Sequence, residues 1–260
     1  MISQGYLLTG VSGLIIGSFL NVLIYRIPRH KNVVFDRSAC PICGRRIAWY
    51  HNIPLLSYLL LLGKCASCRH PISVRYPIVE TVNAAVYLFF LWRFGLTLEF
   101  AVFSGLASAL LVIFFIDLDF QIIPDAITLP GMIAGLAVSF LPNGIGIVPA
   151  LVGLVVGGGA LYLIALAGDF LFKKESMGGG DIKMAAMLGA FLGWKKVLLV
   201  FMLSAVVGLV VSLVIMAFSR TLRRHRIIPF GPFLSIAAVV ALLYGDQIVR
   251  FYVTTFLISK

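Results

Sequence analysis

Long apolar runs fill most of the chain, and short polar, glycine- or proline-containing breaks separate them. A helix needs about 20 apolar residues to cross the hydrocarbon core of a membrane, so these runs predict membrane-spanning helices. The expected spans are residues 5–25, 77–96, 98–116, 126–142, 146–172, 182–193, 197–218 and 229–249. The run at 182–193 is too short to cross unaided, which indicates a short helix that lines a wet cavity or begins deeper in the membrane. The three glycines at 157–159 predict close contact between helices.

Composition supports this interpretation. Of the 260 residues, 61% are hydrophobic and only 12% are charged, and the mean hydropathy is +1.05. Soluble domains carry about 25% charged residues. An ordinary cytosolic globule, a disordered chain and a secreted disulfide scaffold are therefore excluded. We expect an all-α polytopic membrane protein with about eight transmembrane helices.

A single polar segment, residues 26–76, follows the first apolar run. The chain then divides into a first transmembrane helix (1–25), a loop module (26–76) and a transmembrane core (77–260). The first run does not resemble a cleavable signal peptide, because its basic residues follow the apolar stretch and no small-residue cleavage site ends it.

Basic residues outnumber acidic ones by 21 to 10, which gives a net charge of +11. Nine of the basic residues lie between Arg26 and Arg75, with Asp36 as the one acid among them. Two further basic segments are Lys173, Lys174 and Lys183, and Arg220, Arg223, Arg224 and Arg226. Even numbers of expected spans separate the three segments, so all three are predicted on the cytoplasmic side. Nucleic-acid binding is disfavoured, because no soluble domain is available to carry it.

All four cysteines lie in the polar module, as two C-x-x-C pairs separated by 21 residues: Cys40, Cys43, Cys65 and Cys68. Two such knuckles are typical of a structural zinc site with four thiolate ligands, in a small module similar to a zinc ribbon. Disulfides are less compatible with a cytoplasmic module, and redox activity would need only one pair. A closed site of this kind does no hydrolysis. Its expected role is to fold a loop that lacks a core of its own.

Carboxylates at the ends of apolar runs are the candidate catalytic groups, because charges at membrane depth are costly. Asp117 and Asp181 are both expected at cytoplasmic helix ends, where two acids can activate one water molecule as in aspartic proteolysis. Other functions fit the residues too. Asp117, Asp119, Asp125 and Glu80 suit the ion path of a transporter or channel, and the module suits a non-enzymatic assembly factor. More ordinary roles are a helix start for Asp125, with Thr128 in its first turn, and a salt bridge to Arg75 for Glu80.

The combination of motifs is more specific than its parts. The motifs are Gly17-Ser18-Phe19-Leu20-Asn21-Val22, the two C-x-x-C pairs, Asn52-Ile53-Pro54-Leu55, Arg75-Tyr76-Pro77-Ile78-Val79-Glu80, Ile116-Asp117-Leu118-Asp119 with Pro124-Asp125, Gly178-Gly179-Gly180-Asp181, and Pro229-Phe230-Gly231-Pro232. Together they closely resemble the bacterial type IV prepilin peptidases, which are intramembrane aspartic proteases with a G-x-G-D motif.

The resemblance implies that Asp117 and Asp181 are the catalytic pair. It implies a peptidase of the bacterial inner membrane that cuts the basic leader of type IV prepilins or pseudopilins on the cytoplasmic side, typically after glycine. It also implies N-methylation of the new N-terminus with S-adenosylmethionine, linked to the cytoplasmic loop. The residues that would hold this cofactor stay unassigned, because the chain has no G-x-G-x-x-G loop. The expected partners are pilin precursors, recognised through their apolar N-terminal helix, and membrane lipid.

Overall fold

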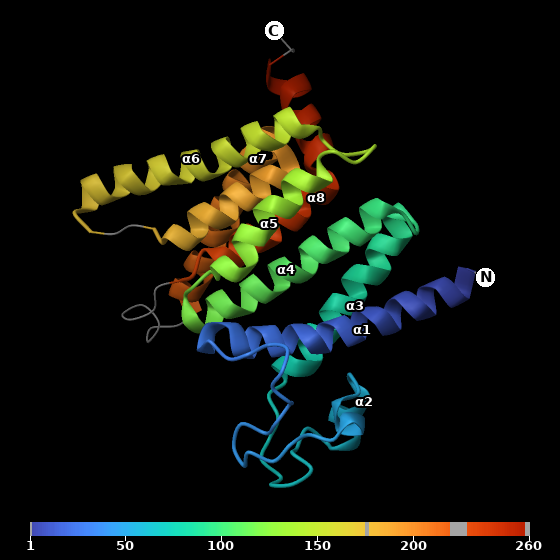
Figure 1. The fold of residues 1–260 in the computed structure, drawn as a ribbon. Coiled ribbons are helices and arrows are strands. Elements are labelled where there is room, and N and C mark those ends of the chain that lie inside the picture. Colours follow the sequence, from blue (N-terminus) through green and yellow to red (C-terminus); the bar gives the residue numbers. More distant parts are fainter. Residues whose placement is uncertain (1, 175–176, 219–227, 258–260) are drawn as a thin grey trace. The chain divides into compact units, whose positions relative to one another are not determined.

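The computed structural model describes residues 2–174, 177–218 and 228–257, and within these it contains helices but no strand (Figure 1). The helices are α1 (Ile2–Arg26), α2 (Leu56–Leu60), α3 (Arg75–Phe94), α4 (Leu98–Phe120), α5 (Asp125–Val138), α6 (Ile147–Phe172), α7 (Gly179–Phe218) and α8 (Gly231–Tyr252). Short helical turns are η1 (Ile27–Arg29), η2 (Trp49–Asn52) and η3 (Val253–Leu257). The all-α prediction is confirmed. The third basic segment, at 220–226, lies outside the described residues.

Five of the helices are long and apolar enough to cross a membrane by length and composition: α1, α4, α6, α7 and α8. A multi-pass membrane protein is the class that such helices indicate. Each of the eight expected segments is mainly helical, and the runs 182–193 and 197–218 both fall in α7. α5 is apolar but only 14 residues long, since the chain turns at residues 139–146, inside and just after the expected span.

Contacts divide the chain into two compact units, Met1–Val112 and Ile113–Lys260, with the division inside α4. The first unit holds α1, the polar module, α3 and most of α4. The second holds the last residues of α4 and α5 to α8. The sequence-based division at residue 76 groups the chain by expected role, whereas α3 packs on α1 and so belongs to the first unit.

Small residues bring α1 and α3 close together in the first unit. A Cβ at Gly13 would lie 2.7 Å from the Cα of Ala84, and one at Gly17 would lie 2.7 Å from the Cα of Glu80. Larger residues would therefore push the two helices apart. As a result, the C-terminal part of α1 and the N-terminal part of α3 lie side by side where the module joins them.

A series of buried hydrogen bonds also links helices of the first unit. The Asn83 amide donates a hydrogen bond to the Gly13 carbonyl at 2.8 Å, and the Ser108 hydroxyl donates to the Asn83 Oδ1 at 2.8 Å. The Tyr87 hydroxyl lies 3.1 Å from that of Ser108. Because these groups satisfy one another, they fix α1, α3 and α4 without leaving the Asn83 amide unpaired.

In the second unit α7 packs against α5, α6 and α8. Gly153 of α6 and Gly189 of α7 face each other so closely that a Cβ on either would collide with the other's backbone. The predicted close contact at the glycine triplet holds for two of its members. Gly157 and Gly158 pack against Ala185 and Ala186, whereas nothing lies within 4 Å of a Cβ at Gly159.

Gly193 breaks α7 into two helical halves, with φ 77° and ψ 168°. The first half begins near Ile123, which also contacts the start of α8 at Gly231. At the beginning of the second half, the Lys196 side chain contacts Gly245 near the end of α8. Further along the same half, Gly208 contacts Phe233 near the start of α8. The chain therefore reverses direction at Gly193, a conformation that glycine adopts without steric cost.

Candidate active site and cysteine cluster

Asp117 lies in the last turn of α4 and is 5% exposed. Its Oδ2 accepts a 2.9 Å hydrogen bond from the backbone N–H of Gly231, the first residue of α8. The first N–H groups of a helix have no partner inside the helix, and its N-terminus favours negative charge. The start of α8 therefore holds and stabilises this carboxylate.

Asp181 lies in the first turn of α7, and its own N–H donates to the Gly178 carbonyl at 3.1 Å. Its Oδ1 is buried and has no hydrogen-bond partner within the described part of the chain. A buried acceptor without a partner is unusual in folded proteins, and it marks a group that needs a donor from elsewhere. A substrate or a water molecule is the kind of donor that this oxygen lacks.

The two aspartates come from positions 64 residues apart, yet they meet around Ile123 in the turn between α4 and α5. A Cβ at Gly180 would lie 2.8 Å from the Cβ of Ile123, and a Cβ at Gly231 would lie 3.2 Å from its Cδ1. Asp117 and Asp181 are close enough for their charges to interact. The structure thus brings together the two residues that the sequence singled out.

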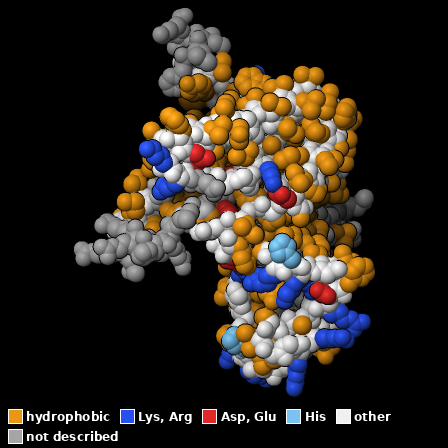
Figure 2. All heavy atoms as spheres, turned by 60° about the vertical axis from the view of Figure 1, so that its left-hand side comes forward, with side chains coloured by type: hydrophobic (Ala, Val, Ile, Leu, Met, Phe, Trp, Pro, Cys, Tyr) orange, Lys and Arg blue, Asp and Glu red, His pale blue; other side chains and the backbone are white. Residues whose placement is uncertain are grey.

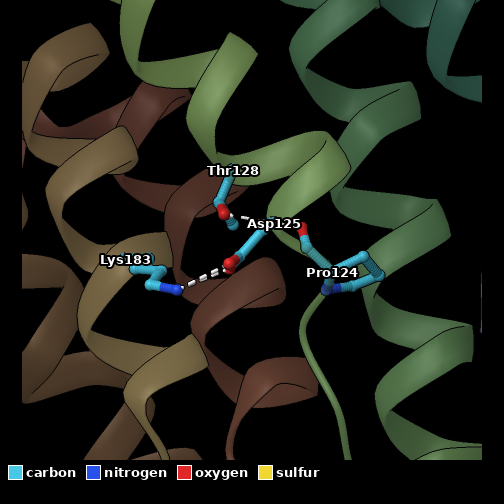
Figure 3. A network of polar contacts seen from close by, with 4 residues as sticks. All are labelled: Pro124, Asp125, Thr128 and Lys183. Atoms are coloured by element: carbon cyan, nitrogen blue, oxygen red, sulfur yellow. Dashed lines mark hydrogen bonds and ion pairs between the residues drawn. The ribbon is translucent and has the colours of Figure 1, made fainter.

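Asp125 starts α5 as expected, but its side chain does not cap the helix (Figure 3). Instead both carboxylate oxygens accept hydrogen bonds from the Lys183 ammonium of α7, at 2.7 and 2.8 Å. The Thr128 hydroxyl donates to the Pro124 carbonyl at 3.4 Å. With 53% of the Asp125 side chain exposed, this ion pair is a surface contact beside the aspartate pair.

The two C-x-x-C pairs form matching turns. The N–H of Cys40 donates to the Arg45 carbonyl and that of Cys65 to the His70 carbonyl, both at 2.9 Å. Isolated β-bridges join Ala39 to Arg46 and Lys64 to Pro71. In each turn the residue after the second cysteine has a positive φ, +69° at Gly44 and +59° at Arg69. The two halves of the module are thus built alike.

The four sulfurs lie within 4.8 Å of one another, and those of Cys40 and Cys68 are 3.9 Å apart. Tetrahedral zinc with Zn–S bonds of about 2.3 Å holds its sulfurs about 3.8 Å apart, so the cluster fits that metal. Backbone N–H groups of Cys68 and Ser67 lower the pKa of the Cys65 thiol to about 6, which favours the thiolate that binds metal. The N–H of His70 lowers the pKa of Cys68, but burial and the neighbouring cysteines outweigh it and raise that pKa to about 11.

Lys and Arg side chains gather over the module at the lower end of the view in Figure 2, and broad apolar surfaces cover the helices. The Glu80 carboxylate, 6% exposed, accepts a 2.8 Å hydrogen bond from the N–H of Leu55 in the module. The expected ion pair with Arg75 is wrong, because no described Lys or Arg pairs with Glu80. A backbone partner leaves no signal in side-chain spacing, which is why the sequence did not reveal it.

Two family models match the chain. Residues 11–94 match the bacterial peptidase A24 N-terminal domain, and residues 104–213 match the type IV leader peptidase family. Curated relatives named prepilin leader peptidase/N-methyltransferase include one from Pseudomonas aeruginosa, 40% identical over 95% of this chain and 92% of its own length. Another, from Pseudomonas putida, is 38% identical over 93% of this chain and 91% of its own.

A relative of the same name from Myxococcus xanthus is 43% identical over 79% of this chain and 62% of its own length. No solved structure matches the chain. The similarity to the two Pseudomonas proteins extends over nearly the whole chain. On these grounds the chain belongs to the type IV leader peptidase family.

Proposed function

We propose that this chain is a membrane-embedded aspartic endopeptidase of the bacterial inner membrane. It removes the basic leader of type IV prepilins or pseudopilins at the cytoplasmic face, typically after glycine. The observation that carries the proposal is the meeting of Asp117 and Asp181 around Ile123. Family membership agrees with it, because the relatives carry the name of this activity.

The surroundings of the two carboxylates suggest different roles. Two neighbouring carboxylates repel each other when both are ionised, so the pair retains one proton. The Gly231 N–H and the start of α8 stabilise negative charge on Asp117, which suits it to take a proton from water. The buried, unpartnered Asp181 then keeps the shared proton and donates it to the oxygen of the scissile carbonyl.

Peptide hydrolysis by this pair returns both aspartates to their starting protonation states. Water oxygen bonds to the carbonyl carbon, its proton passes to Asp117, and the proton of Asp181 passes to the carbonyl oxygen. When the C–N bond breaks, Asp117 returns its proton to the leaving amine and Asp181 recovers one from a hydroxyl of the intermediate. The products are the leader carboxylate and a pilin with a new N-terminus, and the two aspartates end as they began.

Charge argues against the module as the main recruiter of substrate. The module is basic and so are the leaders of this family's substrates, and like charges repel. The bases of the module instead fix the cytoplasmic topology and hold the module on anionic lipid. We therefore assign substrate selection to the apolar helix of the pilin, which docks against helices near the aspartate pair.

The four cysteines are proposed to hold a structural zinc ion. With all four positions of the metal taken by thiolates, no position is left for a reacting water. Its contribution is to fold a segment of about 50 residues that has few buried apolar side chains of its own.

The relatives' name also supports a second activity, N-methylation of the new pilin N-terminus. S-Adenosylmethionine would supply an electrophilic methyl group for transfer to the nitrogen of the new pilin amine. This chain's task is to bind that cofactor near the deprotonated amine and to exclude water from the site.

Cleavage of a prepilin by the purified full chain tests the peptidase assignment. Mass spectrometry of the product should give a new N-terminus directly after a glycine of the leader. Asp117→Asn and Asp181→Asn should each abolish the product while the protein still inserts in the membrane. Cleavage retained in either variant would rule out the pair.

A further inference from the structure

The first unit contains a cavity of about 690 Å³ between two α-helices and the polar module. The C-terminal half of α1 and the first turns of α3 form one side, and module residues around the first C-x-x-C pair form the other. This volume lies in the range of about 300–1,000 Å³ that small-molecule sites occupy. The residues that line it all belong to the first unit, whereas the two aspartates belong to the second.

A buried acid, Glu80, lines the helix side of this cavity. Glu80 is 6% exposed, and the ion pairs of the described residues do not include it. Its carboxylate accepts a hydrogen bond from the N–H of Leu55, and the Ser18 hydroxyl, which also lines the cavity, is a second donor to it. Leu55 adopts φ +58° and ψ −49° in making it, a conformation that non-glycine residues rarely hold without a functional reason. A cationic ligand in the cavity would compensate the charge of this buried carboxylate.

Asn21 adds an unsatisfied acceptor to the same wall. Its Nδ2 donates to the carbonyls of Tyr76 and Gly17, at 3.1 and 3.4 Å, which fixes the orientation of the amide. Its Oδ1 is buried and has no partner among the described residues. Leaving such an oxygen unpaired costs about 1–3 kcal/mol. A ligand that carries N–H or O–H groups would recover this free energy.

The module side of the cavity has the opposite character. Lys31, Arg37 and Arg46 line it together with Asp36 and the ring of Phe35. The helix side adds a fourth base, Arg26, and the rings of Tyr25 and Tyr76. Basic side chains suit a carboxylate, and aromatic rings suit a flat heterocycle that can stack on them. The ligand that this lining fits therefore has a cation, a carboxylate, polar hydrogens and an aromatic base in one molecule.

We propose that this cavity is the binding site of S-adenosylmethionine, with a cationic group of the cofactor against Glu80 and its carboxylate toward the bases of the module. The proposal rests on the methyltransferase activity proposed above. The molecule has all four features: a sulfonium and an ammonium, a carboxylate, ribose hydroxyls and an adenine ring. The module supplies most of the residues that line this cavity, so the site would form only when the module is folded.

Equilibrium binding of radiolabelled S-adenosylmethionine to the full chain in detergent tests the site without any pilin. Val22→Trp fills the cavity from α1 and should abolish binding. Leu23→Trp puts the same bulk on the next residue of α1, which does not line the cavity, and should bind like the wild type. Glu80→Gln keeps an acceptor for Leu55 but removes the charge, and should weaken binding at least about tenfold. Melting temperature shows whether each variant is folded.

The outcomes separate this site from the function on which it rests. If the wild type does not bind the cofactor, the methyltransferase assignment fails and the site fails with it. If the wild type binds but folded Val22→Trp and Glu80→Gln bind equally well, the cofactor site lies elsewhere. A parallel titration with S-adenosylhomocysteine, which lacks the sulfonium charge, tells which cation faces Glu80. A loss on Glu80→Gln with both ligands indicates the ammonium, and a loss with S-adenosylmethionine alone indicates the sulfonium.

Discussion

The first backbone N–H of α8, at Gly231, donates its hydrogen bond to the Oδ2 of Asp117 at 2.9 Å. The contact is possible because Gly231 has no side chain: a Cβ there would lie 2.6 Å from that oxygen. One glycine therefore supplies both the donor and the space for the carboxylate.

Gly231→Ala should reduce the kcat for prepilin cleavage by at least about 100-fold, because it displaces Asp117 from the position in which it faces Asp181. Gly159→Ala is the matched control, since nothing lies within 4 Å of a Cβ at that residue of α6. Cleavage rates of the two purified variants check the prediction. Near-normal activity of a folded Gly231→Ala protein would contradict it.

The two glycines before Asp181 should differ sharply in tolerance. A Cβ at Gly180 would lie 2.8 Å from the Cβ of Ile123, whereas nothing lies within 4 Å of one at Gly179. Gly180→Ala should therefore nearly abolish prepilin cleavage, and Gly179→Ala should leave it within a factor of about three. The comparison is made by initial rates at saturating prepilin, and equal losses in both variants would show that the space beside Ile123 is not what matters.

Asp125→Asn should have a mild effect. Its ion pair with Lys183 is exposed, and such pairs contribute only about 0–1 kcal/mol, so we expect less than a fivefold loss of kcat/KM. Lys183→Gln should match it, because it removes the same pair from the other helix. A loss as complete as that of Asp117→Asn would mean that Asp125 takes part in the chemistry.

The matching turns of the module predict opposite responses to two substitutions. Gly44 and Arg69 occupy the same place after each C-x-x-C pair, with φ +69° and +59°. Gly44→Ala should destabilise the module by about 1–2 kcal/mol although its Cβ meets no neighbour, because the left-handed conformation disfavours a side chain. Arg69→Gly should be neutral or stabilising.

The measurement for this pair is zinc retained per chain during titration with a competing chelator. Gly44→Ala should lose zinc at lower chelator concentration than the wild type, and Arg69→Gly should not. An active wild-type protein that contains no zinc would overturn the metal assignment itself.

Neutral residues in place of exposed module bases should leave leader recognition intact. Arg45→Gln with Lys64→Gln reduces the positive charge of the module without touching the aspartate pair. We expect KM for prepilin within about twofold of the wild type at moderate ionic strength, because like-charged partners gain little from each other. A severalfold rise in KM with normal membrane insertion would show that the module does recruit the leader.

The helices could be predicted, and the two candidate aspartates singled out, because the signals for both are local. Apolar runs mark the helices, and the motifs around Asp117 and Asp181 mark the site. Helix ends were less accurate: α4 continues to Phe120 because its last turn carries Asp117 and Asp119 as part of the helix and not as its stop. Such an end depends on tertiary contacts like the Gly231 hydrogen bond.

What the sequence did not reveal are pairings between distant positions. Lys183 lies 58 residues from Asp125, and no spacing rule connects them. Glu80 bonds to the backbone of Leu55, a partner that any residue type could supply. The unpaired Oδ1 of Asn21 could not be predicted either, because it depends on the two carbonyls that accept hydrogen bonds from its Nδ2. The sequence identifies candidate functional side chains, whereas their interaction partners depend on the fold.

The break at Gly193 limits the first half of α7 to Gly179–Leu192, or about 21 Å of helix at 1.5 Å per residue. A hydrocarbon layer of about 30 Å is thicker than that. If the Gly193 turn stays near the far interface, Asp181 sits several ångströms beneath the near one unless the bilayer becomes thinner around it. In both cases hydrolysis requires that the scissile peptide bond of the substrate enters the membrane or that the bilayer thins around the site. Bilayers built from longer acyl chains should therefore slow the enzyme.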